Sequence, residues 1–114
     1  MDALELILLY DYYGNLLTQR QRECFELRYN QDLSFGEIGQ ELGISRQGVF
    51  DNLNRTEALL RNMEAKTGCV SRDLRCRKAA GRISALAEAL LVNDNAQVSD
   101  LARKILSEVK SLEE

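Results

Sequence analysis

The segment from residue 33 to residue 53 constrains the fold of this chain more than any other part of its sequence. Ser34 and Glu37 have the spacing of a capping box, which opens a short helix. Gly43 then ends that helix, because the position after a helix usually needs a positive φ that glycine adopts without steric cost. Ser45 can cap a second helix by accepting a hydrogen bond from its first free amides. The segment therefore predicts a helix-turn-helix.

Small and apolar residues occur where two such helices would meet. Gly39 lies in the middle of the first helix, where a small residue would let the second helix approach. Ile44 fills the turn, and Val49 and Leu53 close the core from the second helix. An unrelated helical hairpin with a glycine turn is the alternative, although it does not require these residues at these offsets.

Helical patterns also cover the rest of the chain, and proline, which kinks or ends helices, is absent. Caps and apolar spacing predict further helices from an Asp2–Glu5 capping box to Gly14, and over 19–29, 46–66, 71–92 and 96–112. A short turn joins the last two, which should form an antiparallel hairpin. No β-strand pattern occurs. We therefore predict an all-α fold without a winged element, in which residues 1–66 form a helix-turn-helix domain. Residues 67–114 form a C-terminal helical extension, packed on the same core or in a dimer.

The apolar surface of two predicted helices exceeds what one short core can cover. The last helix carries a continuous apolar stripe from Val98 to Leu112. The first helix is apolar on nearly all sides, through Leu4, Leu6, Ile7, Leu8, Leu9, Tyr10, Tyr12 and Tyr13. Because apolar patches of this size usually mark an interface, and two-fold pairing is the commonest arrangement, we expect a homodimer.

Composition argues against an enzyme. The chain has no histidine, which removes the usual general base and metal ligand. Its three cysteines, Cys24, Cys69 and Cys76, form no C-x-x-C pair and are too few for a structural zinc site. Phosphate-binding glycine loops and nucleophile motifs are missing. We expect no catalytic residues, metal, cofactor or small-molecule substrate.

The chain also lacks the features of an exported or membrane protein. Its start has no basic segment typical of a signal peptide, and no apolar run approaches the roughly 20 residues that span a bilayer. An odd number of cysteines fits a reducing compartment. We therefore expect a cytoplasmic protein without a membrane span.

The charge distribution points to local rather than general contact with nucleic acid. The net charge of −3, from 15 basic and 18 acidic residues, argues against attraction of a polyanion to the whole surface. A local basic cluster could still bind phosphates, and the clearest one is Arg72, Arg75, Arg77 and Lys78. An ordinary solvated helix face is the other interpretation of this cluster.

The second helix of the motif carries the other candidate contacts. With Val49 and Leu53 inward, the helical wheel places Gln47, Asp51, Asn54 and Arg55 outward. Arg46 lies in the first turn, near the place of a backbone phosphate, and Gln47 and Asn54 could read base edges. Phe50 lies on the flank, where it could stack on an unpaired base, fill a protein pocket or contact a neighbouring helix. The predicted nucleic-acid-binding residues are Arg46, Gln47, Phe50, Asn54, Arg55, Arg72, Arg75, Arg77 and Lys78.

The motif resembles two known groups of proteins. Residues 33–60 resemble region 4 of bacterial sigma factors, the helix-turn-helix that reads the −35 promoter element. Residues 6–64 are more similar to the YlxM-like family, through residues 9–18, 21–23 and 33–38. The most specific segment is Ser45-Arg46-Gln47-Gly48-Val49-Phe50-Asp51-Asn52. Sigma factors usually carry basic or polar groups where this chain has Gly48, Phe50 and Asp51, which weakens the case for promoter recognition.

The YlxM-like resemblance implies a partner. Proteins of that family are small bacterial proteins encoded beside the signal recognition particle GTPase and viewed as accessory or regulatory factors of its pathway. The resemblance implies binding to that GTPase, to the particle's RNA, or to both. Two other hypotheses stay open: a DNA-binding transcriptional regulator, which Arg46, Gln47 and Asn54 allow, and a purely structural helical dimer.

Overall fold

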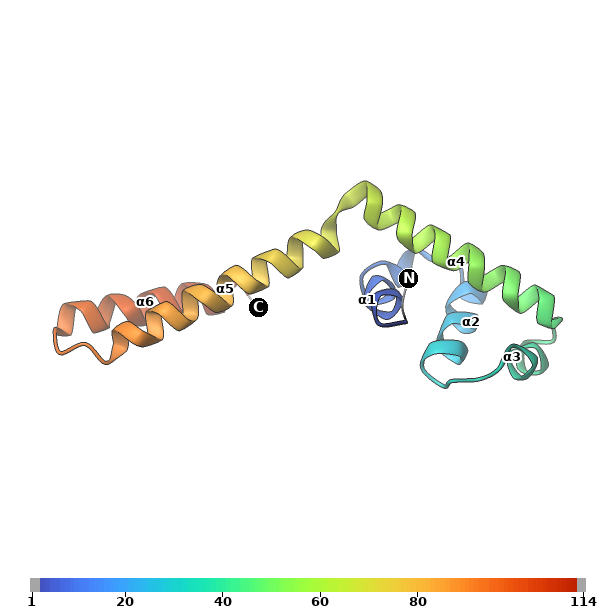
Figure 1. Cartoon of the computed structure of the whole chain (residues 1–114), viewed down its shortest axis with the longest axis horizontal. Helices are drawn as coiled ribbons and strands as arrows, with labels where there is room; N and C mark the ends of the chain where they lie inside the picture. Colours follow the sequence, from blue (N-terminus) through green and yellow to red (C-terminus); the bar gives the residue numbers. More distant parts are fainter. Residues whose placement is uncertain (1–2, 113–114) are drawn as a thin grey trace. The chain divides into compact units, whose positions relative to one another are not determined.

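All regular elements of the computed structural model are helices, and the structure describes residues 3–112 (Figure 1). No strand occurs among these residues, so the predicted all-α class is confirmed. The chain divides into two compact units, residues 1–70 and 71–114. The elements are α1 (Ala3–Tyr13), the 3₁₀ helix η1 (Gly14–Leu16), α2 (Gln19–Tyr29), α3 (Phe35–Leu42), α4 (Arg46–Thr67), α5 (Cys69–Leu91) and α6 (Ala96–Ser111).

Side-chain caps fix the helix starts that the sequence predicts. The hydroxyl of Ser34 accepts a hydrogen bond from the Glu37 N–H at 3.1 Å, and the Glu37 carboxylate accepts one from the Ser34 N–H at 3.0 Å. Ser45 Oγ accepts from the Gly48 N–H at 3.0 Å. These bonds satisfy amides that have no partner within their own helices. Asp2 of the predicted first capping box lies outside the described residues.

The fifth helix begins two residues before the predicted start at Ser71. Gly68 ends α4 with a φ of 62°, which leaves the amides of the following turn without helical partners. Thr67 Oγ1 accepts a hydrogen bond from the Cys69 N–H at 3.3 Å, and Glu64 Oε1 accepts one from the Val70 N–H at 3.0 Å. Since side chains of α4 satisfy these amides, α5 starts immediately after the glycine.

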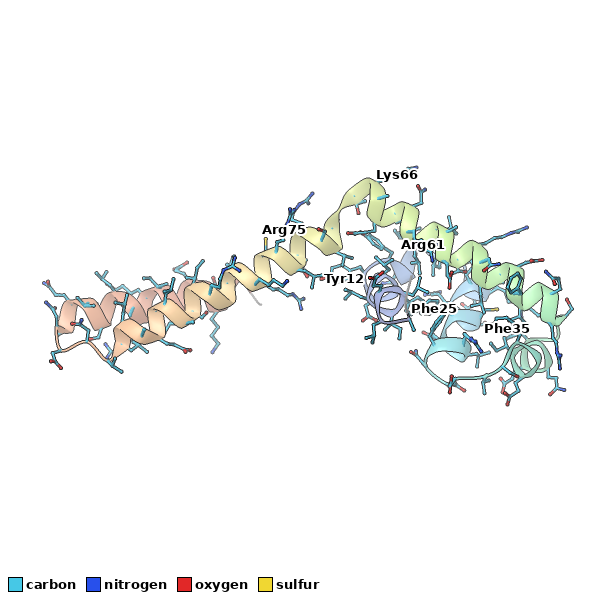
Figure 2. The ribbon with its side chains drawn as sticks, in the orientation of Figure 1. Tyr12, Phe25, Phe35, Arg61, Lys66 and Arg75 are labelled. Carbon is cyan, nitrogen blue, oxygen red and sulfur yellow. The ribbon has the colours of Figure 1, made fainter. Side chains whose placement is uncertain are left out.

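A first cluster of apolar side chains joins α1, α2, α4 and the start of α5. Phe25, labelled in Figure 2, is buried in this cluster. Its ring stacks on that of Tyr10, with the ring centroids 4.3 Å apart. Most apolar side chains of α1 pack in or against this cluster, although Leu4 remains exposed to solvent. The cluster consists of Leu6, Leu9, Tyr13, Leu17, Phe25, Leu60 and Val70.

Tyrosine hydroxyls at the edge of this cluster have carboxylate partners. Tyr10 donates to Glu26 at 2.8 Å, and Tyr29 donates to Glu57 at 2.9 Å. Partial burial, followed by the hydrogen bond to the carboxylate, raises the pKa of both tyrosines to about 12. The rings therefore contribute apolar area while their polar ends stay paired.

A second cluster forms the core of the helix-turn-helix. Cys24, Ile38, Val49 and Leu53 are buried together, and the half-buried Ile44 packs against them from the turn. The predicted inward positions of the motif are thus confirmed. The cluster holds α3 and α4 against α2.

The second unit contains a helical hairpin. Residues 92–95 connect α5 to α6, which returns alongside α5 in Figure 1. Asn95 caps α6 by accepting a hydrogen bond from the Gln97 N–H at 2.9 Å. The predicted C-terminal hairpin is therefore confirmed. No helix among residues 3–112 is long and apolar enough to cross a membrane.

Replacing Gly43 with valine is expected to lower the free energy of unfolding by about 1–3 kcal/mol. Gly43 has a φ of 70°, and an added Cβ would meet no atom within 4 Å, so the cost comes from the backbone conformation rather than from a clash. Gly81→Val is the control, because Gly81 also lies in open space but has no positive φ. Equal stability of both variants in urea denaturation would contradict the left-handed turn.

Candidate nucleic-acid interface

The tight turn between α3 and α4 positions the exposed face of α4. The Ile44 N–H donates a hydrogen bond to the Gly39 carbonyl at 3.0 Å, which closes the turn. A Cβ on Gly39 would lie 2.6 Å from the Ile44 carbonyl oxygen. The prediction that Gly39 admits the second helix is therefore corrected, because the group that approaches it is the backbone of the turn.

The first three turns of α4 expose every residue that the sequence predicts to contact nucleic acid on this helix. Val49 and Leu53 are buried on the opposite side, as the helical wheel requires. These exposed candidates are Arg46, Gln47, Phe50, Asn54 and Arg55, and Asp51 is exposed among them.

A hydrogen bond within α4 engages one of the base-reading candidates. Gln47 Nε2 donates to Asp51 Oδ1 at 3.0 Å. The amide oxygen of Gln47 retains its capacity to accept a hydrogen bond, whereas the carboxylate of Asp51 adds negative charge to the face. This arrangement disfavours phosphate near Asp51 and limits the hydrogen bonds that Gln47 can offer to a base edge.

Phe50 is both packed and accessible. Its ring meets the ring of Phe35, at the start of α3, edge to face with centroids 6.0 Å apart. The side chain is nevertheless 44% exposed. Phe35 lies between α3 and α4 in Figure 2, and the Arg28 guanidinium carbon lies 4.7 Å from the centroid of its ring. Phe35 therefore covers part of the Phe50 side chain, and the exposed part of the ring remains available for stacking.

Two arginines from different helices flank a hollow at the start of α3. Arg28 of α2 and Arg46 of α4 line it together with Ser34, Phe35 and Gly36. A Cβ on Gly36 would lie 2.9 Å from Arg46 Nε, so the glycine leaves room for the guanidinium group. Arg28 also donates to the Leu33 carbonyl at 3.0 Å, which holds its side chain in place.

Arg28 is a residue that the sequence analysis did not identify. Its guanidinium group and that of Arg46 can both meet a phosphate at the N-terminal end of α3, where the helix dipole also favours an anion. One acid opposes this, because the Glu37 carboxylate lines the adjoining hollow. Its hydrogen bond from the Ser34 N–H lowers the pKa of Glu37 further below neutral pH, so its carboxylate is charged there.

The other predicted contacts lie on α5, in the unit of residues 71–114. Arg72, Arg75, Arg77 and Lys78 are exposed there. Arg77 Nε forms an ion pair with Asp73 Oδ2 at 3.2 Å, which reduces its availability for a phosphate. The structure thus places five of the candidates on the first three turns of α4 and the other four on α5, in the other unit.

The three cysteines differ in their exposure to solvent. Cys24 is buried, and burial raises the pKa of its thiol. Cys69 and Cys76 are free and exposed. Among residues 3–112, no three His, Cys, Asp or Glu side chains lie together in a way that could hold a metal ion.

Curated relatives of the chain are UPF0122 proteins of bacteria. The relative from Thermoanaerobacter sp. (strain X514) is 55% identical over 71 residues, which cover 62% of this chain and 61% of that protein. The relative from Acetivibrio thermocellus is 50% identical over 81 residues, or 70% and 69% of the two chains. The relative from Bacillus cereus (strain AH187) is 53% identical over 58 residues, or 51% and 53%. The chain thus spans less than two thirds of the length of the first of these relatives.

The family comparison covers the whole motif. The model of the protein family UPF0122, which describes YlxM/p13-like helix-turn-helix proteins, matches residues 1–94. This range runs from α1 to the end of α5 and includes the turn between α3 and α4. The chain therefore belongs to the UPF0122 family of YlxM/p13-like helix-turn-helix proteins.

Proposed function

We propose that this protein binds nucleic acid through the surface formed by the start of α3 and the first three turns of α4. The observation that carries the proposal is the pair of arginines, Arg28 and Arg46, around the hollow at the start of α3, with Phe50 exposed beside it. Paired guanidinium groups suit a phosphate, and an accessible aromatic ring suits an unpaired base.

We propose that the nucleic acid is the RNA of the signal recognition particle, and that the protein is an accessory factor of that pathway. The YlxM-like resemblance is the basis for the pathway. The surface supports RNA over a promoter, because Gln47 is bonded to Asp51 and Phe50 occupies the flank of α4. RNA loops offer unstacked bases to an aromatic ring, whereas a duplex does not. The GTPase of the particle is the proposed protein partner.

A DNA-binding regulator is the second candidate. Asn54 and Arg55 are exposed on α4, and the α3–turn–α4 geometry is that of proteins that place the second helix in the major groove. Asn54 could contact adenine, and Arg55 could contact a phosphate or guanine.

We further propose that the protein acts in the cytoplasm as a homodimer and as a binding protein without catalytic activity. A dimer would present the helix-turn-helix twice. The apolar side chains of α5 and α6 that remain exposed support this assembly.

Removing Arg46 or Phe50 is expected to weaken RNA binding in different ways. Arg46→Ala should lower the slope of log affinity against log salt concentration by roughly 1, because one phosphate contact is lost. Phe50→Ala should cost on the order of 1–3 kcal/mol of binding through lost stacking, with the slope unchanged. The measurement is a fluorescence titration with signal recognition particle RNA, promoter-like duplex DNA and the isolated GTPase.

Arg61→Ala is the matched control on α4. Arg61, labelled in Figure 2, is exposed and lies further along the helix. Its Nη2 forms an ion pair with Glu57 Oε2 at 3.6 Å. Its loss should leave RNA affinity nearly unchanged. Tight, sequence-selective duplex binding would favour the regulator instead. Binding to the GTPase alone, unaffected by Arg46→Ala or Phe50→Ala, would show that the motif is a protein-interaction surface and would contradict the proposed RNA contact.

A further inference from the structure

The hairpin of α5 and α6 buries small side chains and leaves larger aliphatic ones outside. Its buried residues, called the seam here, are Ala80, Ala87, Ser99, Ala102 and Val109. Six larger residues, called the aliphatic face, are each at least 40% exposed: Ile83, Leu86, Leu90, Leu101, Ile105 and Leu112. Two helices that bury so little apolar area gain little stability from packing on each other alone.

The six residues of the aliphatic face lie on one side of the hairpin. On α5, Leu86 precedes the seam residue Ala87 by one position. On α6, Leu101 precedes the seam residue Ala102 in the same way. In a pair of antiparallel α-helices whose seams face each other, the residue one position before a seam residue points to the same side of the pair in both helices. The exposed side chains therefore form a continuous apolar surface across both helices.

Charge is distributed unevenly along the hairpin. The end near the turn, residues 83–102, contains Glu88, Asp94 and Asp100 and no basic residue. The open end, residues 71–82 and 103–114, contains eight basic and four acidic residues. One end is therefore acidic and the other has a basic excess. A second hairpin in the opposite orientation would place each acidic end against a basic one.

We propose that the aliphatic face packs against the same face of a second copy of this chain, with the two hairpins antiparallel in a four-helix bundle. The charge pattern is self-complementary in this orientation, which a two-fold axis produces directly. Four helices around an apolar core are a stable arrangement, and pairing would bury the apolar side chains that a single hairpin leaves exposed. The inference rests on the homodimer proposed above and is independent of what the helix-turn-helix binds.

Sedimentation equilibrium of the full chain tests the position of the interface. Leu86→Glu and Leu101→Glu should each raise the dimer dissociation constant by about 100-fold or more, because a charge would enter an apolar contact. Both residues are exposed in the single chain, so circular dichroism should show unchanged helix content. Leu4→Glu on α1 is the matched control at an exposed apolar position, and should leave the dissociation constant unchanged.

The orientation is tested by charge reversal. Asp94→Lys should weaken an antiparallel dimer by about three- to tenfold, because it lowers the negative charge of the end that would face the partner's basic end. Stronger association of Asp94→Lys would indicate parallel hairpins and overturn the proposed orientation.

Loss of the dimer in Leu4→Glu alone would place the interface on the first unit and overturn this inference while the homodimer stands. A wild-type monomer at a protein concentration of about 100 µM would contradict both. That result would leave the proposed RNA contact standing, because RNA affinity is measured in a separate experiment.

Discussion

Phe25→Ala is expected to lower the free energy of unfolding by about 3–5 kcal/mol, a large share of the stability of a domain of this size. Phe25 is buried and lies 4.3 Å from Tyr10 and 4.5 Å from Tyr29 between ring centroids. Alanine would leave a cavity where α1 and α2 meet, and both tyrosines would lose a stacking partner. The rings are held by hydrogen bonds to Glu26 and Glu57, which limits their collapse into the space.

Urea denaturation followed by circular dichroism measures this loss. Phe50→Ala is the control, since Phe50 is 44% exposed and makes one edge contact with Phe35. We expect the control to lose less than half as much as Phe25→Ala. A loss below about 1 kcal/mol for Phe25→Ala would mean that the first cluster is not the main core of this unit.

Gly39→Ala is expected to destabilise the protein by about 3 kcal/mol, which is large for the addition of one methyl group. The new Cβ would lie 2.6 Å from the Ile44 carbonyl oxygen, a backbone atom that cannot rotate away. The turn must open to relieve the clash, which weakens the hydrogen bond from the Ile44 N–H to the Gly39 carbonyl. The start of α4, including Arg46, would move with the turn.

Gly36→Ala is the matched control in the same helix. Its Cβ would also make a close contact, but with the flexible side chain of Arg46, which can move. This variant should change stability by less than about 1 kcal/mol. Differential scanning calorimetry should therefore separate the two alanine variants by many degrees. Equal melting temperatures would show that the turn does not approach Gly39 as closely as the structure indicates.

Features that depend on neighbouring residues could be predicted from the sequence. The Ser34–Glu37 capping box, the positive φ of Gly43 and the cap at Ser45 each involve groups within a few positions of one another. The inward side of α4 follows from helical periodicity alone. These local rules were sufficient to predict the helix-turn-helix and the exposed face of its second helix.

Features that depend on tertiary packing could not be predicted in this way. Arg28 and Arg46 are 18 positions apart, and only the packing of α2 against α3 and α4 places both at one hollow. The early start of α5 depends on Glu64 and Thr67, side chains of the preceding helix. The atom nearest to Gly39 likewise belongs to the turn, which no spacing pattern identifies.

The affinity of Asp51→Asn for signal recognition particle RNA tests the central claim most directly. Asp51 is the acid on the exposed face of α4, and asparagine keeps an oxygen that can accept the hydrogen bond from Gln47. Removing its charge should raise RNA affinity by about two- to fivefold, because repulsion between the carboxylate and phosphates disappears. The effect should shrink as salt is added. Weaker or unchanged RNA binding by Asp51→Asn at low salt would contradict the claim that this face of α4 meets nucleic acid.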